Sequence, residues 1–217
     1  MTHTLNVALS DFVKQQTAGR DPSHGWEHMA KVARVAMELY HELPIPSQLK
    51  IYVPVLLAVA WLHDVNDHKY DPEGKGLAAT RAFLVSCYLP ANTILALIDA
   101  ISFSKEQKLR QVTGNKHREQ WLQKFGVEGL LIRDLVSDAD KLEALGAIGY
   151  ERCVQFARHR YPTYNRKQLA EAVLAHYTEK LGHLASDYLV TPAARLRGEL
   201  ATTELKVLIL KGCQEHM

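Results

Sequence analysis

Apolar residues recur at spacings of three and four along most of this 217-residue chain, and that period constrains its fold more than any other feature. The clearest stripe consists of residues on one face of a single helix, namely Met29, Val32, Val35, Ala36 and Leu39. Glycine and proline, with 12 and 8 copies, are too few for the frequent turns of a β-sandwich or barrel. No Asn-Gly or Asp-Gly pair separates alternating runs. We therefore predict an all-α fold.

Turn-forming residues set the ends of the predicted helices. One helix is expected to start at residues 21–23 and another to run from Ser47 to about residue 64. A long amphipathic helix is predicted at 169–189, and Thr191, which is followed by proline, starts the last helix. The most loop-like stretches are residues 68–75, 105–118 and 159–166.

The predicted helices follow one another without an internal repeat, a low-complexity segment or a linker. A chain of this length buries about 70% of its unfolded surface, which is enough for one stable core. We therefore predict a single domain over residues 1–217, with additional C-terminal helices at about 166–213. An apolar stripe at 205–210 either seals the core or forms a dimer interface, and a homodimer stays open.

Composition excludes several classes of protein. Lys and Arg number 26 and Asp and Glu number 24, so the net charge of +2 argues against a nucleic-acid binder that relies on bulk electrostatics. Cys87, Cys153 and Cys213 form no CxxC pair, and we predict free thiols in a reducing compartment. The longest apolar run, about residues 51–62, is shorter than the roughly 20 residues that cross a bilayer. With no signal-peptide pattern at residue 1, we predict a soluble, cytoplasmic protein without membrane partners.

Three segments place polar residues inside apolar helices. His24 and His28 are four residues apart and share a helix face, so they either point at one site or form a surface pair at a helix start. His63 and Asp64 close an apolar helix, where an adjacent His-Asp is costly to bury unless it is paired or binds a metal. The third segment, residues 135–146, contains Asp138 and Asp140.

Asp138 and Asp140 lie on different sides of the helix predicted for the third segment, because positions i and i+2 diverge. At most one of them is expected to face the same cleft as the His-Asp pair, and a solvated or capping carboxylate is the alternative. Imidazole nitrogens and carboxylate oxygens together suit a divalent metal such as Mn, Fe, Zn, Co or Ni. Two histidines and two aspartates from three helices could hold one ion and leave positions open for water and substrate.

Taken in order, the polar residues of the three segments resemble the H…HD…D signature of HD-domain metal-dependent phosphohydrolases. The surrounding words are similar too: residues 28–32 resemble the family's H-x-x-[RK]-V, and residues 62–65 resemble its L-H-D-[IV]. Residues 138–149 are very close to the D-A-D-[RK]-L-[DE]-A-[LI]-G-A-I-G of a subgroup of small stand-alone hydrolases, the YpgQ and YedJ type. The motifs cover about residues 20–160, and the resemblance implies a helical HD-domain bundle.

The resemblance implies a metal site and the residues around it. The family's four metal ligands correspond to His28, His63, Asp64 and Asp140, and the metal would be Mn, Mg, Co, Ni, Fe or Zn. Asp138 would then orient a ligand.

The resemblance also implies residues that act on the substrate. Asp67 lies where related hydrolases carry an acidic residue that handles protons, so it would be the general acid or base. The candidates for binding the substrate are the residues Lys69, His24, Lys141, Lys105 and Arg152. The residue after His24 is usually Asp in the family and is glycine here, which weakens a second-metal role for that segment.

The function implied is hydrolysis of a phosphate ester or anhydride in a nucleotide, as in dNTP pyrophosphohydrolases or nucleoside monophosphatases. The partner would be a small phosphorylated molecule, and no nucleic acid is expected. Two alternatives stay open. An HD-fold di-iron oxygenase would need further His ligands, and only His24 and His68 lie nearby in the sequence. A nucleotide sensor without catalytic activity would bind nucleotides and not turn them over.

Overall fold

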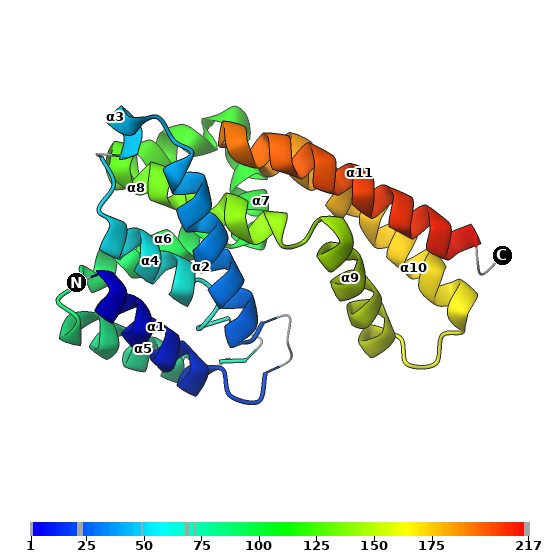
Figure 1. The fold of residues 1–217 in the computed structure, drawn as a ribbon, viewed down its shortest axis with the longest axis horizontal. Coiled ribbons are helices and arrows are strands. Elements are labelled where there is room, and N and C mark those ends of the chain that lie inside the picture. Colours follow the sequence, from blue (N-terminus) through cyan, green and yellow to red (C-terminus); the bar gives the residue numbers. More distant parts are fainter. Residues whose placement is uncertain (1, 21–23, 49, 68–69, 72, 215–217) are drawn as a thin grey trace. The chain divides into compact units, whose positions relative to one another are not determined.

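The computed structural model describes residues 2–20, 24–48, 50–67, 70–71 and 73–214 (Figure 1). Within these ranges the regular structure is helical throughout, with no strand, so the predicted all-α fold is confirmed. No helix in this part of the chain is long and apolar enough to cross a membrane. The chain divides into two compact units, residues 1–137 and 138–217. The single-domain interpretation stays a prediction.

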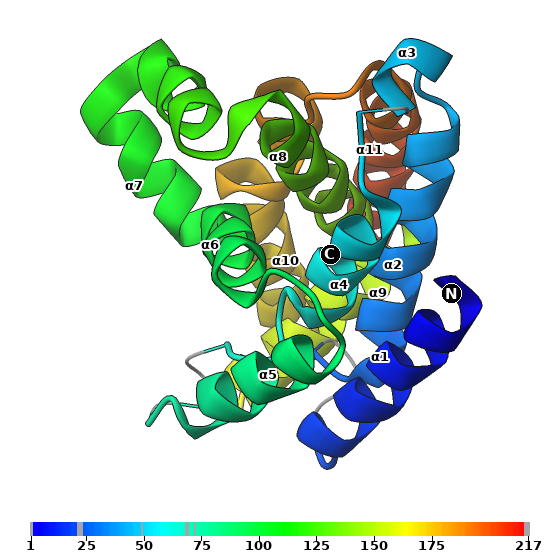
Figure 2. The same ribbon diagram turned by 90° about the vertical axis from the view of Figure 1, so that its left-hand side faces the viewer.

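The first unit is built around α4 (Val53–Leu62), which contacts α1 (Thr2–Gln16), α2 (Trp26–His41) and α6 (Ala91–Ile101) (Figure 2). Every residue of α4 from Val55 onward is buried, because this helix is apolar on all sides. The remaining helices of the unit are α3 (Ile45–Gln48), α5 (Lys75–Ser86), α7 (Phe103–Thr113), a short 3₁₀ turn at Gly114–Lys116 and most of α8 (His117–Leu142).

The second unit begins near the end of α8 and contains α9 (Gly146–Arg160), α10 (Arg166–Glu179) and α11 (Pro192–Gln214). A 3₁₀ turn (Leu181–His183) and a π-helical turn (Leu184–Tyr188) connect α10 to α11. Helix α11 contacts both α9 and α10. A methyl group at Gly198 would lie 2.2 Å from Leu189 Cδ1, so glycine permits this close approach of α11 to the preceding segment.

Several predicted boundaries in the sequence were wrong. Residues 105–118 form α7, a 3₁₀ turn and the start of α8, whereas we expected a loop. The helix expected from Ser47 to about residue 64 is interrupted, since α3 ends at Gln48 and α4 begins at Val53. Pro54 lies in the first turn of α4, where proline is tolerated because its missing N–H has no partner within the helix. The helix expected at 169–189 ends at Glu179. The start expected at 21–23 lies outside the described residues.

Candidate metal centre

His63 and Asp64 lie where α4 ends. The helix is buried up to Leu62, and His63 is its C-terminal cap residue. The ring of His63 is oriented by its own helix, since Nδ1 lies 2.8 Å from the carbonyl oxygen of Ala60. A carbonyl oxygen only accepts, so Nδ1 carries the proton and Nε2 carries the lone pair that a metal would use.

His28 lies in the first turn of α2, and its side chain is buried. Its ring centroid is 5.2 Å from that of His63, and the two planes meet at 67°. One ligand atom from each of His28, His63 and Asp64 lies within 4.8 Å of the others. Two imidazoles and a carboxylate at this spacing fit a divalent ion with N and O ligands. Three of the four predicted ligands are therefore gathered in the first unit.

A second group shares Asp64. Ligand atoms of His24, Asp64 and Asp67 also lie within 4.8 Å of one another, and all three side chains are partly buried. The hydroxyl of Tyr70 lies 3.3 Å from His24 Nδ1. The proposed proton-transfer residue Asp67 and the proposed substrate-binding residue His24 are thus neighbours of the three-residue group.

Arg20 holds the backbone that carries Asp64, although no sequence pattern indicated a role for it. Its Nη1 donates to the carbonyl oxygen of Asp64 at 3.0 Å, and its Nη2 donates to that of Val65 at 2.6 Å. The guanidinium also lies 4.7 Å from the ring centroid of Tyr70. Backbone acceptors leave no mark in a sequence, so no motif could have identified Arg20.

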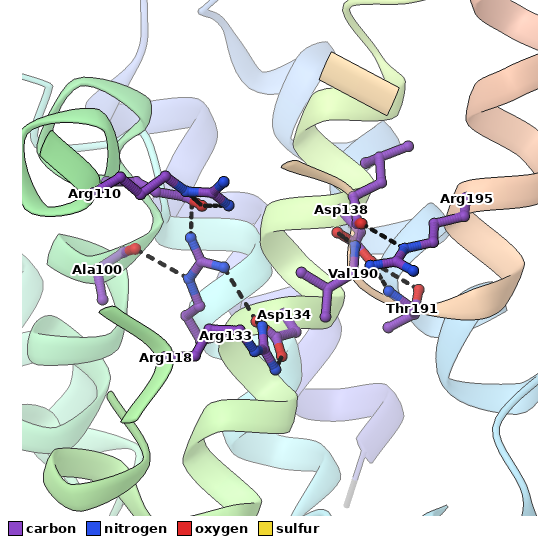
Figure 3. Close-up of polar contacts among 11 residues, drawn as sticks. Ala100, Arg110, Arg118, Arg133, Asp134, Asp138, Val190, Thr191 and Arg195 are labelled. Atoms are coloured by element: carbon purple, nitrogen blue, oxygen red, sulfur yellow. Dashed lines mark hydrogen bonds and ion pairs between the residues drawn. The ribbon is translucent and has the colours of Figure 1, made fainter. Parts of the chain in front are cut away.

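In the second unit, Asp138 anchors the start of α11 (Figure 3). Its fully buried carboxylate accepts hydrogen bonds from the backbone N–H groups of Val190 and Thr191, at 2.9 and 2.7 Å, and from the Thr191 hydroxyl at 2.7 Å. These contacts are those of a structural anchor. Its predicted role in orienting a metal ligand stays a prediction.

The other predicted residues of the second unit lie on α8 and α9. Asp140 is half-buried on α8, and its role as the fourth ligand stays a prediction. Lys141, next to it, is buried, with Nζ 5.9 Å from the ring centroid of Tyr188. Arg152 on α9 donates from Nη1 to the carbonyl oxygen of Glu143 at 3.4 Å.

The two remaining candidates for substrate binding, Lys105 and Lys69, belong by residue number to the first unit. Lys105, in the first turn of α7, is exposed and forms an ion pair with Asp99 of α6. Lys69 lies outside the described residues.

The indole N–H groups of Trp26 and Trp61 donate to Ser10 and Asn6 at 2.9 and 2.8 Å, which supports a packing role for both rings.

Comparison with known proteins places the fold. No family model and no curated protein matches the chain. A Lactobacillus plantarum protein of known structure is 26% identical, with a TM-score of 0.69 over 99% of this chain and 98% of that one. Bacillus subtilis YpgQ in complex with ADP is 22% identical, with a TM-score of 0.66 over 97% of this chain and 95% of that one.

An HD-superfamily hydrolase from Bacillus thuringiensis is 21% identical, with a TM-score of 0.64 over 99% of this chain and 95% of that one. The chain therefore has the fold of the HD-domain, YpgQ-like proteins, and the resemblance predicted from the sequence is confirmed at the level of the fold.

Proposed function

We propose that this protein is a divalent-metal-dependent phosphohydrolase that acts on a phosphate ester or anhydride of a nucleotide. The observation that carries the proposal is the group formed by His28, His63 and Asp64, whose ligand atoms lie within 4.8 Å of one another. The fold shared with an HD-superfamily hydrolase supports hydrolysis. The complex of B. subtilis YpgQ with ADP supports a nucleotide as the ligand.

His28, His63 and Asp64 would hold the metal, with Asp140 of the second unit as the fourth ligand implied by the sequence motif. A divalent ion bound there would activate water for attack and offset negative charge on the phosphate. His63 is prepared for this role, because the Ala60 carbonyl oxygen fixes its proton on Nδ1. Asp67 would accept or donate a proton next to Asp64, within the group that it forms with His24.

The proposed substrate-binding side chains are cations that would neutralise phosphate charge. Lys141 and Arg152 come from the second unit, and Lys69 and Lys105 from the first. His24 would bind near the reacting phosphate, since its ring shares a group with Asp64 and Asp67. Base preference and the number of phosphates hydrolysed would be set by residues outside the metal ligands.

The first prediction tests the metal ligands. His63→Ala and Asp64→Ala should each lose bound metal and at least about 100-fold in hydrolysis, because each removes one of few ligands. Metal content is measured by elemental analysis, and activity with Mn, Mg, Co or Ni against nucleoside mono-, di- and triphosphates. His41→Ala and Asp11→Ala, at exposed positions of α2 and α1, are the matched controls. Full hydrolysis by metal-depleted Asp64→Ala would refute the proposal.

The second prediction separates metal binding from proton transfer. Asp67→Asn keeps the shape of the side chain and removes its ability to take up a proton, so we expect unchanged metal content and a fall in kcat of about 100-fold or more. Phosphate and pyrophosphate release are measured on the metal-loaded enzyme. Unchanged turnover would remove Asp67 from the mechanism.

The second group of His24, Asp64 and Asp67 is the one observation that favours the oxygenase alternative, since a second ion sharing Asp64 could be held there. Metal stoichiometry decides between the two functions. About one ion per chain supports hydrolysis, and about two irons per chain would support oxygenase chemistry. Nucleotide binding without turnover in the presence of every metal tested would indicate a sensor.

A further inference from the structure

Helices α9, α10 and α11 of the second unit contact one another (Figure 1), and a cavity of about 200 Å³ lies among them. It is lined by residues within 150–158 of α9, 166–173 of α10 and 209–212 of α11, and we call it the three-helix cavity. The lining residues follow the three-to-four spacing of a single helix face. Each helix therefore presents one side to the cavity.

The wall of the three-helix cavity is mostly apolar. Val173 and Ile209 are 4% and 2% exposed, and Val154 and Leu169 are partly buried. An engineered cavity of about 150 Å³ with an apolar lining stays dry and binds benzene. The three-helix cavity therefore has room for one ring or a short alkyl chain, and burial of such a group would contribute affinity.

Three polar side chains complete the lining, namely those of Tyr150, Arg158 and Arg166. Tyr150 is partly buried, and both arginines are exposed. In the part of the chain that the structure describes, none of these three side chains forms a hydrogen bond or an ion pair. By contrast, Arg195 of α11 donates from Nε to the carbonyl oxygen of Leu189 at 2.9 Å. The donors at the cavity are therefore available to a ligand.

The segment that carries both cavity arginines is strongly basic. Residues 152–170 contain five Lys and Arg residues and no Asp or Glu. Among the described residues, no acidic side chain lines the cavity, and Glu171 lies outside the face of α10 that does. Positive charge around a concave site attracts anions. An anion between two guanidinium groups would also offset their mutual repulsion.

We propose that the three-helix cavity binds a small organic anion. One ring or a short alkyl chain fills the apolar part, and a carboxylate or phosphate group meets Arg158 and Arg166. A guanidinium group recognises either oxyanion through paired N–H donors, and the Tyr150 hydroxyl offers one more donor. The cavity is lined by the second unit alone, whereas His28, His63 and Asp64 belong to the first. The inference therefore does not depend on the proposed hydrolase activity.

The first test compares probe ligands by NMR titration of the isotope-labelled full chain. Benzoate and phenylphosphonate each carry one ring and one oxyanion, and at least one of them should bind saturably with a Kd below about 1 mM. The tighter of the two identifies the head group. Benzamide, which is neutral, and acetate, which has no ring, should each bind about tenfold more weakly or worse. No saturable binding of either ring anion up to about 10 mM would overturn the proposal.

The second test removes the cavity's own groups. Arg158→Met and Arg166→Met should each raise the Kd of the tighter ring anion about tenfold or more, because each removes a charge-assisted donor. Ala170→Leu fills the cavity and leaves both arginines in place, so it should weaken binding as well. Lys167→Met is the matched control, since Lys167 is an exposed neighbour of Arg166 that does not line the cavity. An equal loss in Lys167→Met would show attraction to the basic segment as a whole and refute the cavity as the site.

A third comparison excludes the metal centre as the place where the anion binds. Asp64→Ala removes a proposed metal ligand and should keep the Kd of the ring anion within about twofold, since distant sites act independently. Circular dichroism checks that each variant is folded. Loss of binding in Asp64→Ala, together with an unchanged Kd in Arg166→Met, would place the anion at the metal centre and overturn the proposal.

Discussion

At the residue scale, the chain fixes His63 and Asp64 through backbone carbonyl groups. Within α4, the carbonyl oxygen of Ala60 accepts from His63 Nδ1, and beyond the helix the carbonyl oxygens of Asp64 and Val65 accept from Arg20. These contacts hold the segment that follows α4, where water would otherwise compete for the same carbonyl groups. Arg20 therefore acts as a positioning residue for the three-residue metal group.

The third prediction concerns Arg20. Arg20→Met keeps the apolar stem but removes both donors, so the loop carrying Asp64 loses its fixed position. We expect the Kd for Mn²⁺ to rise about tenfold or more, as is typical when a group that orients metal ligands is removed. Titration calorimetry measures the Kd, and Arg20→Lys should recover it only in part because lysine cannot reach both carbonyl groups in a fork. Arg81→Met, at an exposed position of α5, is the control, and an unchanged Kd in Arg20→Met would contradict the assignment.

The group of His28, His63 and Asp64 was predicted through the resemblance to the HD-domain motifs, after polar residues inside apolar helices had indicated the three segments. Arg20 and Tyr70 were not predicted; Arg20 donates to two backbone carbonyl groups, and the Tyr70 hydroxyl lies next to a ring nitrogen of His24. Contacts of this kind form between segments that are far apart in the sequence. The spacing of residues along one helix does not indicate which distant segments come together.

At the scale of elements, buried charges hold α7 and α8 together (Figure 3). Arg133 of α8 is fully buried, ion-paired with Glu106 of α7, and donates to the Ala100 carbonyl oxygen at 3.1 Å. Its guanidinium carbon also lies 3.9 Å from the ring centroid of Trp121. Arg118 donates two hydrogen bonds, at 3.1 and 2.7 Å, to the buried carboxylate of Asp134, which follows Arg133 in the sequence.

The fourth prediction concerns this network. Arg133→Met should lower the free energy of unfolding by about 3–5 kcal/mol, because it leaves the buried Glu106 carboxylate with less compensation. Urea denaturation measures the change. The double variant Glu106→Gln/Arg133→Met should recover part of the loss, since it removes the buried charge. Arg34→Met, in an exposed ion pair with Glu38, should cost less than about 0.5 kcal/mol. A similar loss in Arg34→Met would rule out burial as the cause.

The same network explains why residues 105–118 were wrongly expected to be a loop. Their composition is polar, but Glu106 is 1% exposed and pairs with Arg110 four residues later, so part of the polarity is buried in ion pairs. Hydrophobic periodicity cannot detect a helix whose buried face is charged. Within α8 the backbone breaks at Gly126, whose φ of 69° favours glycine.

At the scale of the whole molecule, the apolar period was sufficient to predict an all-α chain, and solved structures only 21–26% identical share its fold over 97–99% of its length. The division at residues 137 and 138 was not predictable, because it falls inside α8, in a stretch from residue 130 to 145 that contains no Gly or Pro. A boundary between compact units depends on which distant segments pack together, and the helical period is the same on both sides of it.

The fifth prediction concerns the stability of the whole chain at high pH. Burial raises the pKa of the Cys153 thiol from 9.0 to about 11, because the thiolate loses its hydration in α9. The folded state therefore keeps this proton longer than the unfolded state does. Ionisation of Cys153 therefore leaves the free energy of unfolding nearly unchanged below pH 9 and lowers it as the pH rises from 9 towards 11. By pH 10.5 the free energy of unfolding is about 2 kcal/mol lower.

Urea midpoints at pH 8 and pH 10.5 measure this loss. Cys153→Ala removes the thiol, so the variant should lose about 2 kcal/mol less than the wild type over the same interval, whatever other groups titrate there. Cys87→Ala is the matched control, as Cys87 is a partly exposed thiol at the end of α5. Equal losses in the wild type and in Cys153→Ala would show that the Cys153 thiol ionises as readily in the folded chain as in the unfolded one, and the second unit would then be open to solvent around α9.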